Sequence, residues 1–136
     1  MTKAPVGYSG KALIDKLGLK PGGVLCAVGA PKHYRELVSP LPDGATLKTA
    51  PDAKAQIVHL FVADTAALKA KIKATVAALP AGAALWISWP KKSSAKFVDL
   101  TEDGIRKLVL PTGLVDVKVA AVDEDWSGLK FLRRKT

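Results

Sequence analysis

Three short runs of apolar residues, separated by turn-forming and polar segments, constrain the fold of this chain most strongly. They cover residues 24–28, 57–62 and 83–89. Continuous apolar runs of this length are typical of strands that are covered on both faces, as in a parallel sheet. We therefore expect three buried strands, with Cys26 packed in the first of them as a small apolar side chain.

The third run carries two tryptophans and ends at a proline followed by two lysines. Because side chains alternate along a strand, Trp86 and Trp89 should lie on opposite faces of the sheet, both in the core. Pro90 should end the strand, and Lys91 and Lys92 should begin the loop that leaves it.

Amphipathic segments alternate with these runs, as expected for helices that cover a sheet. The longest spans residues 65–79, with its N-cap at Asp64 or Thr65 and solvated lysines on its flanks. A shorter helix should follow Pro31, and residues 45–48 are expected to form a weak edge strand. The expected apolar stripes are Leu13, Ile14 and Leu17 in the first helix, Leu68, Ile72, Val76 and Leu79 in the longest, and Ile105, Leu108 and Val109 in the last.

Capping residues indicate where two of these helices begin. Ser9 is the expected N-cap of the first helix, on which Lys11 and Lys16 should face water. Asp99 and Glu102 have the spacing of a capping box for the last helix.

Two further strands are predicted at residues 115–122 and 128–132, joined through residues 123–127 as a hairpin. Only the tail that begins at Arg133 is expected to fray. Strands that alternate with helices predict a three-layer α/β sandwich with a Rossmann-like, mostly parallel sheet and an antiparallel C-terminal hairpin. Residues 1–136 should form a single domain.

The composition favours a soluble protein of a reducing compartment. The net charge of +9 suggests an anionic partner, but the 17 lysines outnumber the four arginines, which is more typical of a solvated surface than of a dedicated reader of nucleic acid. A single cysteine excludes an intramolecular disulfide. Because no signal peptide or membrane span is evident, we expect a cytoplasmic protein without a membrane partner.

Motifs spread over nearly the whole chain carry a family resemblance. They are Gly7-Tyr8-Ser9-Gly10, Leu17-Gly18-Leu19-Lys20-Pro21-Gly22, Pro40-Leu41-Pro42, Leu85-Trp86, Trp89-Pro90-Lys91-Lys92, Asp99-Leu100-Thr101-Glu102, Leu110-Pro111-Thr112-Gly113-Leu114-Val115-Asp116 and Asp123-Glu124-Asp125-Trp126-Ser127-Gly128-Leu129. In this order they resemble small bacterial proteins known as domain of unknown function three thousand and fifty-two. This resemblance names no activity.

A looser resemblance is to class I methyltransferases, in which similar turns precede two of the strands. The corresponding turns here are Lys20-Pro21-Gly22 and Pro80-Ala81-Gly82, and the terminal hairpin also fits. The resemblance implies the strand order 2-1-3-4-6-5, with one strand and two helices of the full fold missing. It does not extend to the cofactor, because the turn after the first strand has only Gly29 and residues 47–50 supply no acid for a ribose.

The carboxyl ends of the predicted strands should form one rim of the sheet, where open α/β sheets bind their ligands. Lysines at this rim, together with nearby helix N-termini, favour a phosphate or carboxylate. The expected ligand-binding residues are Lys32, His33, Lys91, Lys92, Ser93, Asp125, Trp126 and Ser127.

For several of these residues a structural role is the alternative. Lysines in surface loops are usually only solvated, and Trp126 fits a ligand platform and a structural lid equally well. His33 suits acid or base chemistry at the rim, whereas His59, in the middle of a strand, is typical of a hydrogen-bonded structural histidine. No catalytic residue, metal ligand or cofactor is assigned, so enzymatic activity stays open.

Three functions remain open at this stage. The first is a small anionic ligand bound at the rim, and the second is a nucleic-acid or protein-binding module that uses the basic surface. The third is a degenerate methyltransferase. The oligomeric state is not determined by the sequence.

Overall fold

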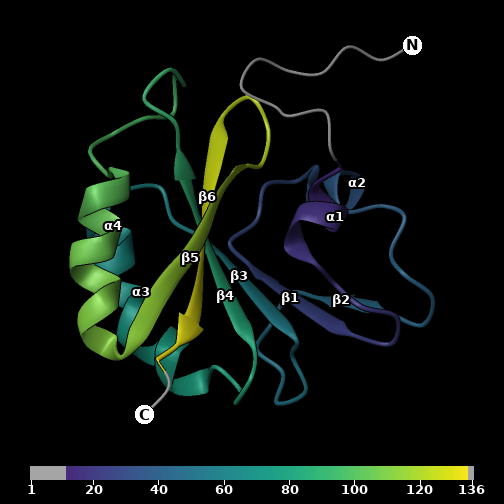
Figure 1. The fold of residues 1–136 in the computed structure, drawn as a ribbon. Coiled ribbons are helices and arrows are strands. Elements are labelled where there is room, and N and C mark those ends of the chain that lie inside the picture. The colour runs from purple at the N-terminus through teal and green to yellow at the C-terminus, as the bar shows by residue number, and fades with distance from the viewer. Residues whose placement is uncertain (1–11, 135–136) are drawn as a thin grey trace.

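A mixed sheet of six strands organises residues 12–134, which are the residues that the computed structural model describes. The strand order is β2-β1-β3-β4-β6-β5, as the resemblance to methyltransferases implies (Figure 1). The first four strands in this order are parallel, and β6 and β5 form the antiparallel hairpin. The elements are α1 (Leu13–Leu17), β1 (Val24–Val28), α2 (Tyr34–Leu37), β2 (Thr46–Lys48), β3 (Ile57–Phe61), α3 (Thr65–Ala78), β4 (Ala84–Pro90), α4 (Glu102–Val109), the 3-10 turn η1 (Leu110–Thr112), β5 (Leu114–Ala121) and β6 (Trp126–Arg133).

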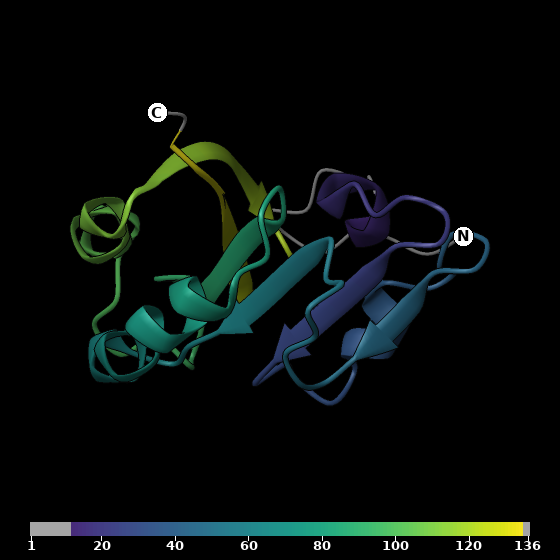
Figure 2. The same ribbon diagram turned by 90° about the horizontal axis from the view of Figure 1, so that it is seen from below.

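Helices cover both faces of the sheet and make the three layers that the sequence predicts. Figure 2 shows α3 and α4 on one side of the sheet and α1 on the other. The face under α3 and α4 buries Trp89, and the opposite face buries Trp86 with residues of α1 and α2. The prediction that the two tryptophans belong to the core on opposite faces is therefore confirmed.

The long helix follows its sequence prediction closely. The Asp64 side chain caps α3 by accepting a hydrogen bond from the backbone N–H of Ala67. All four residues of the expected stripe are buried against the sheet: Leu68, Ile72, Val76 and Leu79. Burial of each such side chain stabilises the fold by about 1.5 to 3 kcal/mol.

The predicted capping box of the last helix is wrong. Thr101, not Asp99, is the N-cap of α4, and its hydroxyl accepts a hydrogen bond from the backbone N–H of Gly104. Asp99 instead accepts hydrogen bonds from the backbone N–H and hydroxyl of Thr65, at the start of α3. The carboxylate therefore ties the two neighbouring helices together.

Three other expectations need correction. Lys16 is buried, because its ammonium reaches across α1 to donate to the carbonyl oxygen of Ala121 at 2.9 Å. Arg133 is not frayed, since it ends β6 and donates to the carbonyl oxygens of Val76 and Leu79 at the end of α3. The expected N-cap Ser9 and the solvated Lys11 lie outside the described residues.

The two ends of the sheet differ in their helical cover. Residues 49–56 connect β2 to β3 without a helix, whereas α3 and α4 cover the strands β3, β4 and β6. Along the described residues, no helix is long and apolar enough to cross a bilayer.

Candidate functional site

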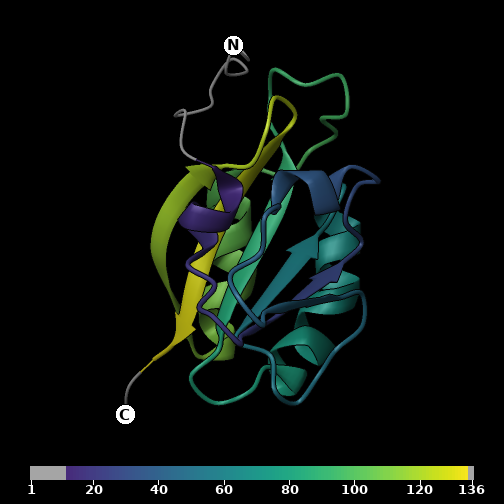
Figure 3. The same cartoon turned by 90° about the vertical axis from the view of Figure 1, so that its right-hand side faces the viewer.

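The carboxyl ends of the parallel strands meet the start of β6 at one rim of the sheet. In the view of Figure 1 the loop after β4 and the tip of the β5–β6 hairpin stand at the top of the molecule, and Figure 3 shows the same edge from the side. The chain leaves β1 toward β2 and leaves β3 toward β4, so the strand order reverses between β1 and β3. This is the position at which open α/β sheets bind ligands.

His33 and Asp123 form the most direct link across this rim. Asp123 lies in the hairpin turn, 90 residues after His33 in the chain, and the distance from its Oδ2 to His33 Nε2 is 2.7 Å. The other carboxylate oxygen of Asp123 accepts hydrogen bonds from the backbone N–H groups of Asp125 and Trp126. The hairpin backbone thus holds the carboxylate in place independently of its contact with the imidazole.

Asp125 connects the hairpin to the loop after β4. Its carboxylate accepts a hydrogen bond from the Ser94 hydroxyl at 2.8 Å, and its carbonyl oxygen accepts one from the backbone N–H of Lys91 at 2.7 Å. The sequence indicated Asp125 as a ligand-binding residue, but in the structure its oxygens hold the loop in place.

Trp126 is the first residue of β6 and pairs with Pro90, so it lies on a strand and not in the hairpin turn as predicted. Its half-buried indole packs edge to face on Phe61, with ring centroids 5.1 Å apart. This contact is the one expected of a structural lid over the core.

The first hollow at the rim, which we name the β1–β2 hollow, has a volume of about 340 Å³. It opens where the chain turns after β1 at Gly29, which has a φ of 71°; a side chain there would come within 3.0 Å of the carbonyl oxygen of Phe61. Glycine therefore allows the turn to pass close to β3. The lining includes Lys32, Arg35 and Thr49 but no acidic residue.

The second hollow, which we name the β4–α4 hollow, has a volume of about 400 Å³ and is lined in part by Lys91, Lys92 and Ser127. Glu102 and Asp103 also line it, and both form ion pairs with Arg106. The Lys91 ammonium nitrogen is buried and has no hydrogen-bond partner among the described residues.

The structure distributes the predicted site residues over the rim rather than gathering them in one pocket. Lys32 lines the β1–β2 hollow, whereas Lys91, Lys92 and Ser127 line the β4–α4 hollow. Ser93 is exposed in the loop between Lys92 and Ser94. The two hollows share no lining residue. The hairpin turn contacts a loop near each of them, through Asp123 with His33 and through Asp125 with Ser94.

Sequence reasoning missed two residues of this rim. Asp123 was placed in the hairpin connection but not paired with His33, because nothing in the sequence indicates a contact over 90 residues. Arg35 was overlooked, although it lies in the short helix expected after Pro31, and it lines the β1–β2 hollow. No acidic residue of the described part of the chain lines the hollow, whose charged lining residues are Lys32 and Arg35.

His59 lies beneath the rim in a buried hydrogen-bond network, as the sequence predicts. Its Nδ1 is 2.8 Å from the Tyr34 hydroxyl, and its Nε2 is 2.6 Å from the Ser88 hydroxyl. Burial lowers the pKa of His59 from 6.5 to about 3, because the charged form would lose its hydration. Burial also raises the pKa of the Tyr34 hydroxyl. The imidazole is therefore neutral at physiological pH and has a structural role.

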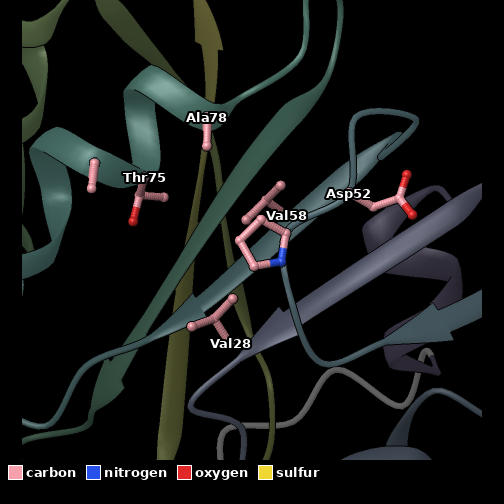
Figure 4. Close-up of a pocket in the computed structure, with 7 residues that line it drawn as sticks. Val28, Asp52, Val58, Thr75 and Ala78 are labelled. Atoms are coloured by element: carbon pink, nitrogen blue, oxygen red, sulfur yellow. The ribbon is translucent and has the colours of Figure 1, made fainter.

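A third pocket, of about 130 Å³, lies away from the rim on the face that α3 covers (Figure 4). Val28, Val58 and Ala78 give it an apolar lining, with Asp52 at its edge. The carboxylate of Asp52 is held by the Lys48 ammonium and by the backbone N–H of Lys54, which lower its pKa. This pocket occupies the place where residues 49–56 replace a helix.

Comparison with known proteins shows the fold. No family model matches this chain, and no curated protein matches it. A SAM-dependent methyltransferase from Aquifex aeolicus superposes with a TM-score of 0.64 at 12% identity, over 92% of this chain and 89% of that one. A magnesium protoporphyrin IX methyltransferase from Synechocystis, solved with bound SAM, gives 0.53 at 15% identity, over 83% and 71%. A fibrillarin pre-rRNA processing protein from Methanococcus jannaschii gives 0.52 at 14% identity, over 86% and 69%.

These similarities establish a minimal class I methyltransferase-like fold. The residues at the rim do not fit the cofactor of that fold as the family binds it. The turn after β1 has a single glycine, and the acid nearest to the end of β2, Asp52, is bound to Lys48 and lines the third pocket instead of the β1–β2 hollow. Among the described residues there is also no group of three or more His, Cys, Asp or Glu side chains that could hold a metal ion.

Proposed function

We propose that this protein binds a small anionic ligand, carrying a phosphate or carboxylate, in the β1–β2 hollow. The observation that carries the proposal is the pair of cations in its lining, Lys32 and Arg35, with no acidic residue in the same lining. Two unopposed cations in a concave site raise the local concentration of anions. Arg35 adds a planar donor set that matches phosphate or carboxylate oxygens.

The position of the hollow supports the same proposal. It lies at the carboxyl end of β1, next to the point where the strand order reverses, and Gly29 allows the backbone of the turn to approach β3 closely. His33 follows Lys32 in the same turn and keeps about half of its side chain exposed. His33 stands in the chain between two residues that line the hollow, Lys32 and Tyr34, but it does not line the hollow itself.

The β4–α4 hollow is a second candidate for the same function, because the buried Lys91 ammonium has no hydrogen-bond partner within residues 12–134. A charged group buried without a partner is costly, and a bound anion would supply the missing contacts. Glu102 and Asp103 weaken this candidate, since they bring negative charge to the same lining. We therefore treat Lys91, Lys92 and Ser127 as a secondary candidate site, and Ser93 lines neither hollow.

Isothermal titration calorimetry with inorganic phosphate, sulfate and nucleoside phosphates tests the proposal, together with crystals soaked in the same ions. We expect Lys32→Ala and Arg35→Ala each to weaken binding about tenfold or more, because each removes a charge-assisted hydrogen bond. Lys69→Ala on the exposed face of α3 is the matched control, since it removes the same charge from a position without a hollow. Unchanged affinity in both hollow variants would overturn the proposal, and a loss confined to Lys91→Ala would move the site to the β4–α4 hollow.

A degenerate methyltransferase is the alternative that the fold favours, since two of the similar structures are methyltransferases and one of them holds SAM. A thermal shift with SAM that exceeds the shift with phosphate alone would support it. The other alternative is a nucleic-acid or protein-binding module that uses the basic surface. Binding to nucleic acid should weaken steeply with salt, with a slope that counts the released counterions. Membership of the domain family named above stays a prediction.

A further inference from the structure

The pair of His33 and Asp123 has the geometry of a proton-accepting dyad at the surface. The two side chains differ in exposure: 47% of the His33 side chain is accessible, but only 12% of that of Asp123. The imidazole thus faces solvent at the rim while its carboxylate partner is largely covered. An orienting acid behind an accessible base is the arrangement that general-base catalysis needs.

The hydrogen bonds around Asp123 determine which ring nitrogen of His33 is free. An ionised carboxylate only accepts hydrogen bonds, so His33 Nε2 must carry the proton that it donates to Asp123 Oδ2. In the neutral imidazole, Nδ1 then has the lone pair. The backbone N–H groups of Asp125 and Trp126 hold the other carboxylate oxygen, so the carboxylate cannot rotate away without breaking two more hydrogen bonds.

We propose that His33 and Asp123 form a hydrolytic dyad, in which His33 Nδ1 activates water against a small carboxylic ester that bears an anionic group. This inference rests on the proposed anion site for the position of its substrate. Lys32 and Tyr34, on either side of His33 in the chain, line the β1–β2 hollow, and His33 does not, so the anionic group would bind in the hollow and the ester group would extend from it to His33. His33 is the catalytic residue and Asp123 the positioning residue. Water is the nucleophile because no hydrogen bond links His33 to a serine, threonine or cysteine in residues 12–134.

The reaction balances without a cofactor. The oxygen of water bonds to the acyl carbon while one of its protons moves to His33 Nδ1, and Asp123 stabilises the resulting imidazolium through Nε2. Collapse of the tetrahedral intermediate breaks the bond between the acyl carbon and the alkoxide oxygen. The proton then passes from Nδ1 to the departing alkoxide, and the products are a carboxylic acid and an alcohol.

The substitution Asp123→Asn separates this role from a structural one. The asparagine carbonyl can still accept from the backbone N–H groups of Asp125 and Trp126, so the hairpin turn is kept. Its NH2 group, however, donates to His33 Nε2, which forces the ring proton onto Nδ1 and removes the free lone pair. The protein has only two histidines, so nitrogen-15 NMR can follow the tautomer of His33 after comparison with His33→Ala.

The rates of hydrolysis of 4-nitrophenyl acetate, which is neutral, and mono-4-nitrophenyl glutarate, which is anionic, test the dyad and the anion site separately. We expect the unmodified protein to hydrolyse both esters and to show saturation with the glutarate. Asp123→Asn and His33→Ala should lower both rates about tenfold or more. Glu124→Gln is the matched control, because it removes the same charge from an exposed neighbour on the same turn, and it should leave both rates unchanged.

The outcomes separate the two proposals. Equal rates in the unmodified protein and in Asp123→Asn, or a proton on His33 Nδ1 in the unmodified protein, would overturn the dyad. If hydrolysis of the neutral ester depends on Asp123 but the rate with the anionic ester shows no saturation, the dyad is supported and the proposed anion site is overturned. Binding of phosphate without any hydrolysis would leave the anion site and overturn the dyad.

Discussion

The two histidines of this protein stand in opposite environments, although both lie near the carboxyl rim of the sheet. His59 points from the middle of β3 into the core, where it is fully buried between two hydroxyl groups. His33 follows β1, is half-exposed and meets a carboxylate. The comparison shows that the partner and the burial, and not the residue type, decide whether an imidazole stabilises the core or remains available for chemistry.

Neutral partners explain why His59 is tolerated in the core. Tyr34 and Ser88 can each donate or accept a hydrogen bond, so they satisfy both ring nitrogens without a charge. The imidazole also stacks on Phe61, with ring centroids 4.3 Å apart. His33 instead forms its hydrogen bond with the carboxylate of Asp123, and about half of its side chain stays in contact with water.

The largest expected effect comes from removing the buried imidazole. His59→Ala should lower the free energy of unfolding by about 3 to 5 kcal/mol, because it leaves a cavity and two buried hydroxyl groups without a partner. Urea denaturation followed by circular dichroism measures this change. A loss below about 1 kcal/mol would show that water replaces the imidazole and that the buried network contributes little.

A smaller effect should appear when the pH is lowered. His59 has a pKa of about 3 in the folded protein and 6.5 when unfolded, so between these values the unfolded chain binds the extra proton. The neutral His59 imidazole therefore makes its full contribution to the free energy of unfolding above pH 6.5. This contribution decreases as the pH falls and is about 2 kcal/mol smaller at pH 5. Urea denaturation curves between pH 7 and pH 5 measure this decrease in the free energy of unfolding. In His59→Phe the free energy of unfolding should decrease less over the same pH range. An equal decrease in that variant would show that other titratable groups cause it.

The smallest expected effect belongs to the exposed histidine. His33→Ala should change the free energy of unfolding by less than about 1 kcal/mol, because water competes for a hydrogen bond to a half-exposed side chain and Asp123 keeps its two backbone hydrogen bonds. Thermal denaturation of His33→Ala and His59→Ala, measured side by side, compares the losses of stability in the two variants. A loss as large as that of His59→Ala would mean that the rim is part of the folding core.

Local signals predicted the elements of this fold well, and long-range contacts explain the errors. The stripe of Leu68, Ile72 and Val76 indicated α3 because its period is that of a helix packed on one side. Asp99 had the spacing of a cap, yet it binds Thr65 of another helix. Lys16 was expected in water because the charge suggested it, but its long side chain reaches the carbonyl oxygen of Ala121.

For the candidate site, the sequence indicated that the ligand-binding residues lie at the carboxyl rim of the sheet. It did not indicate that they line two separate hollows. Lys32 and Lys91 were both expected there because each follows a buried strand, and parallel strands end at the same edge. In the structure they line two hollows that share no residue, and Asp123 and Asp125 of the hairpin turn contact distant loops near both. The sequence of a hairpin turn does not indicate which distant loops its side chains will contact.

By itself, the sequence determined the alternation of strands and helices, the burial of Trp86 and Trp89 and the edge of the sheet at which polar loops gather. These features follow from the periodicity of apolar residues and from the free-energy cost of exposing apolar surface to water. Both can be recognised within short stretches of the sequence. Only the tertiary structure decided that His33 meets Asp123 and that His59 meets Tyr34 and Ser88. Those contacts join residues 25 to 90 positions apart, and their geometry depends on how every strand between them is placed.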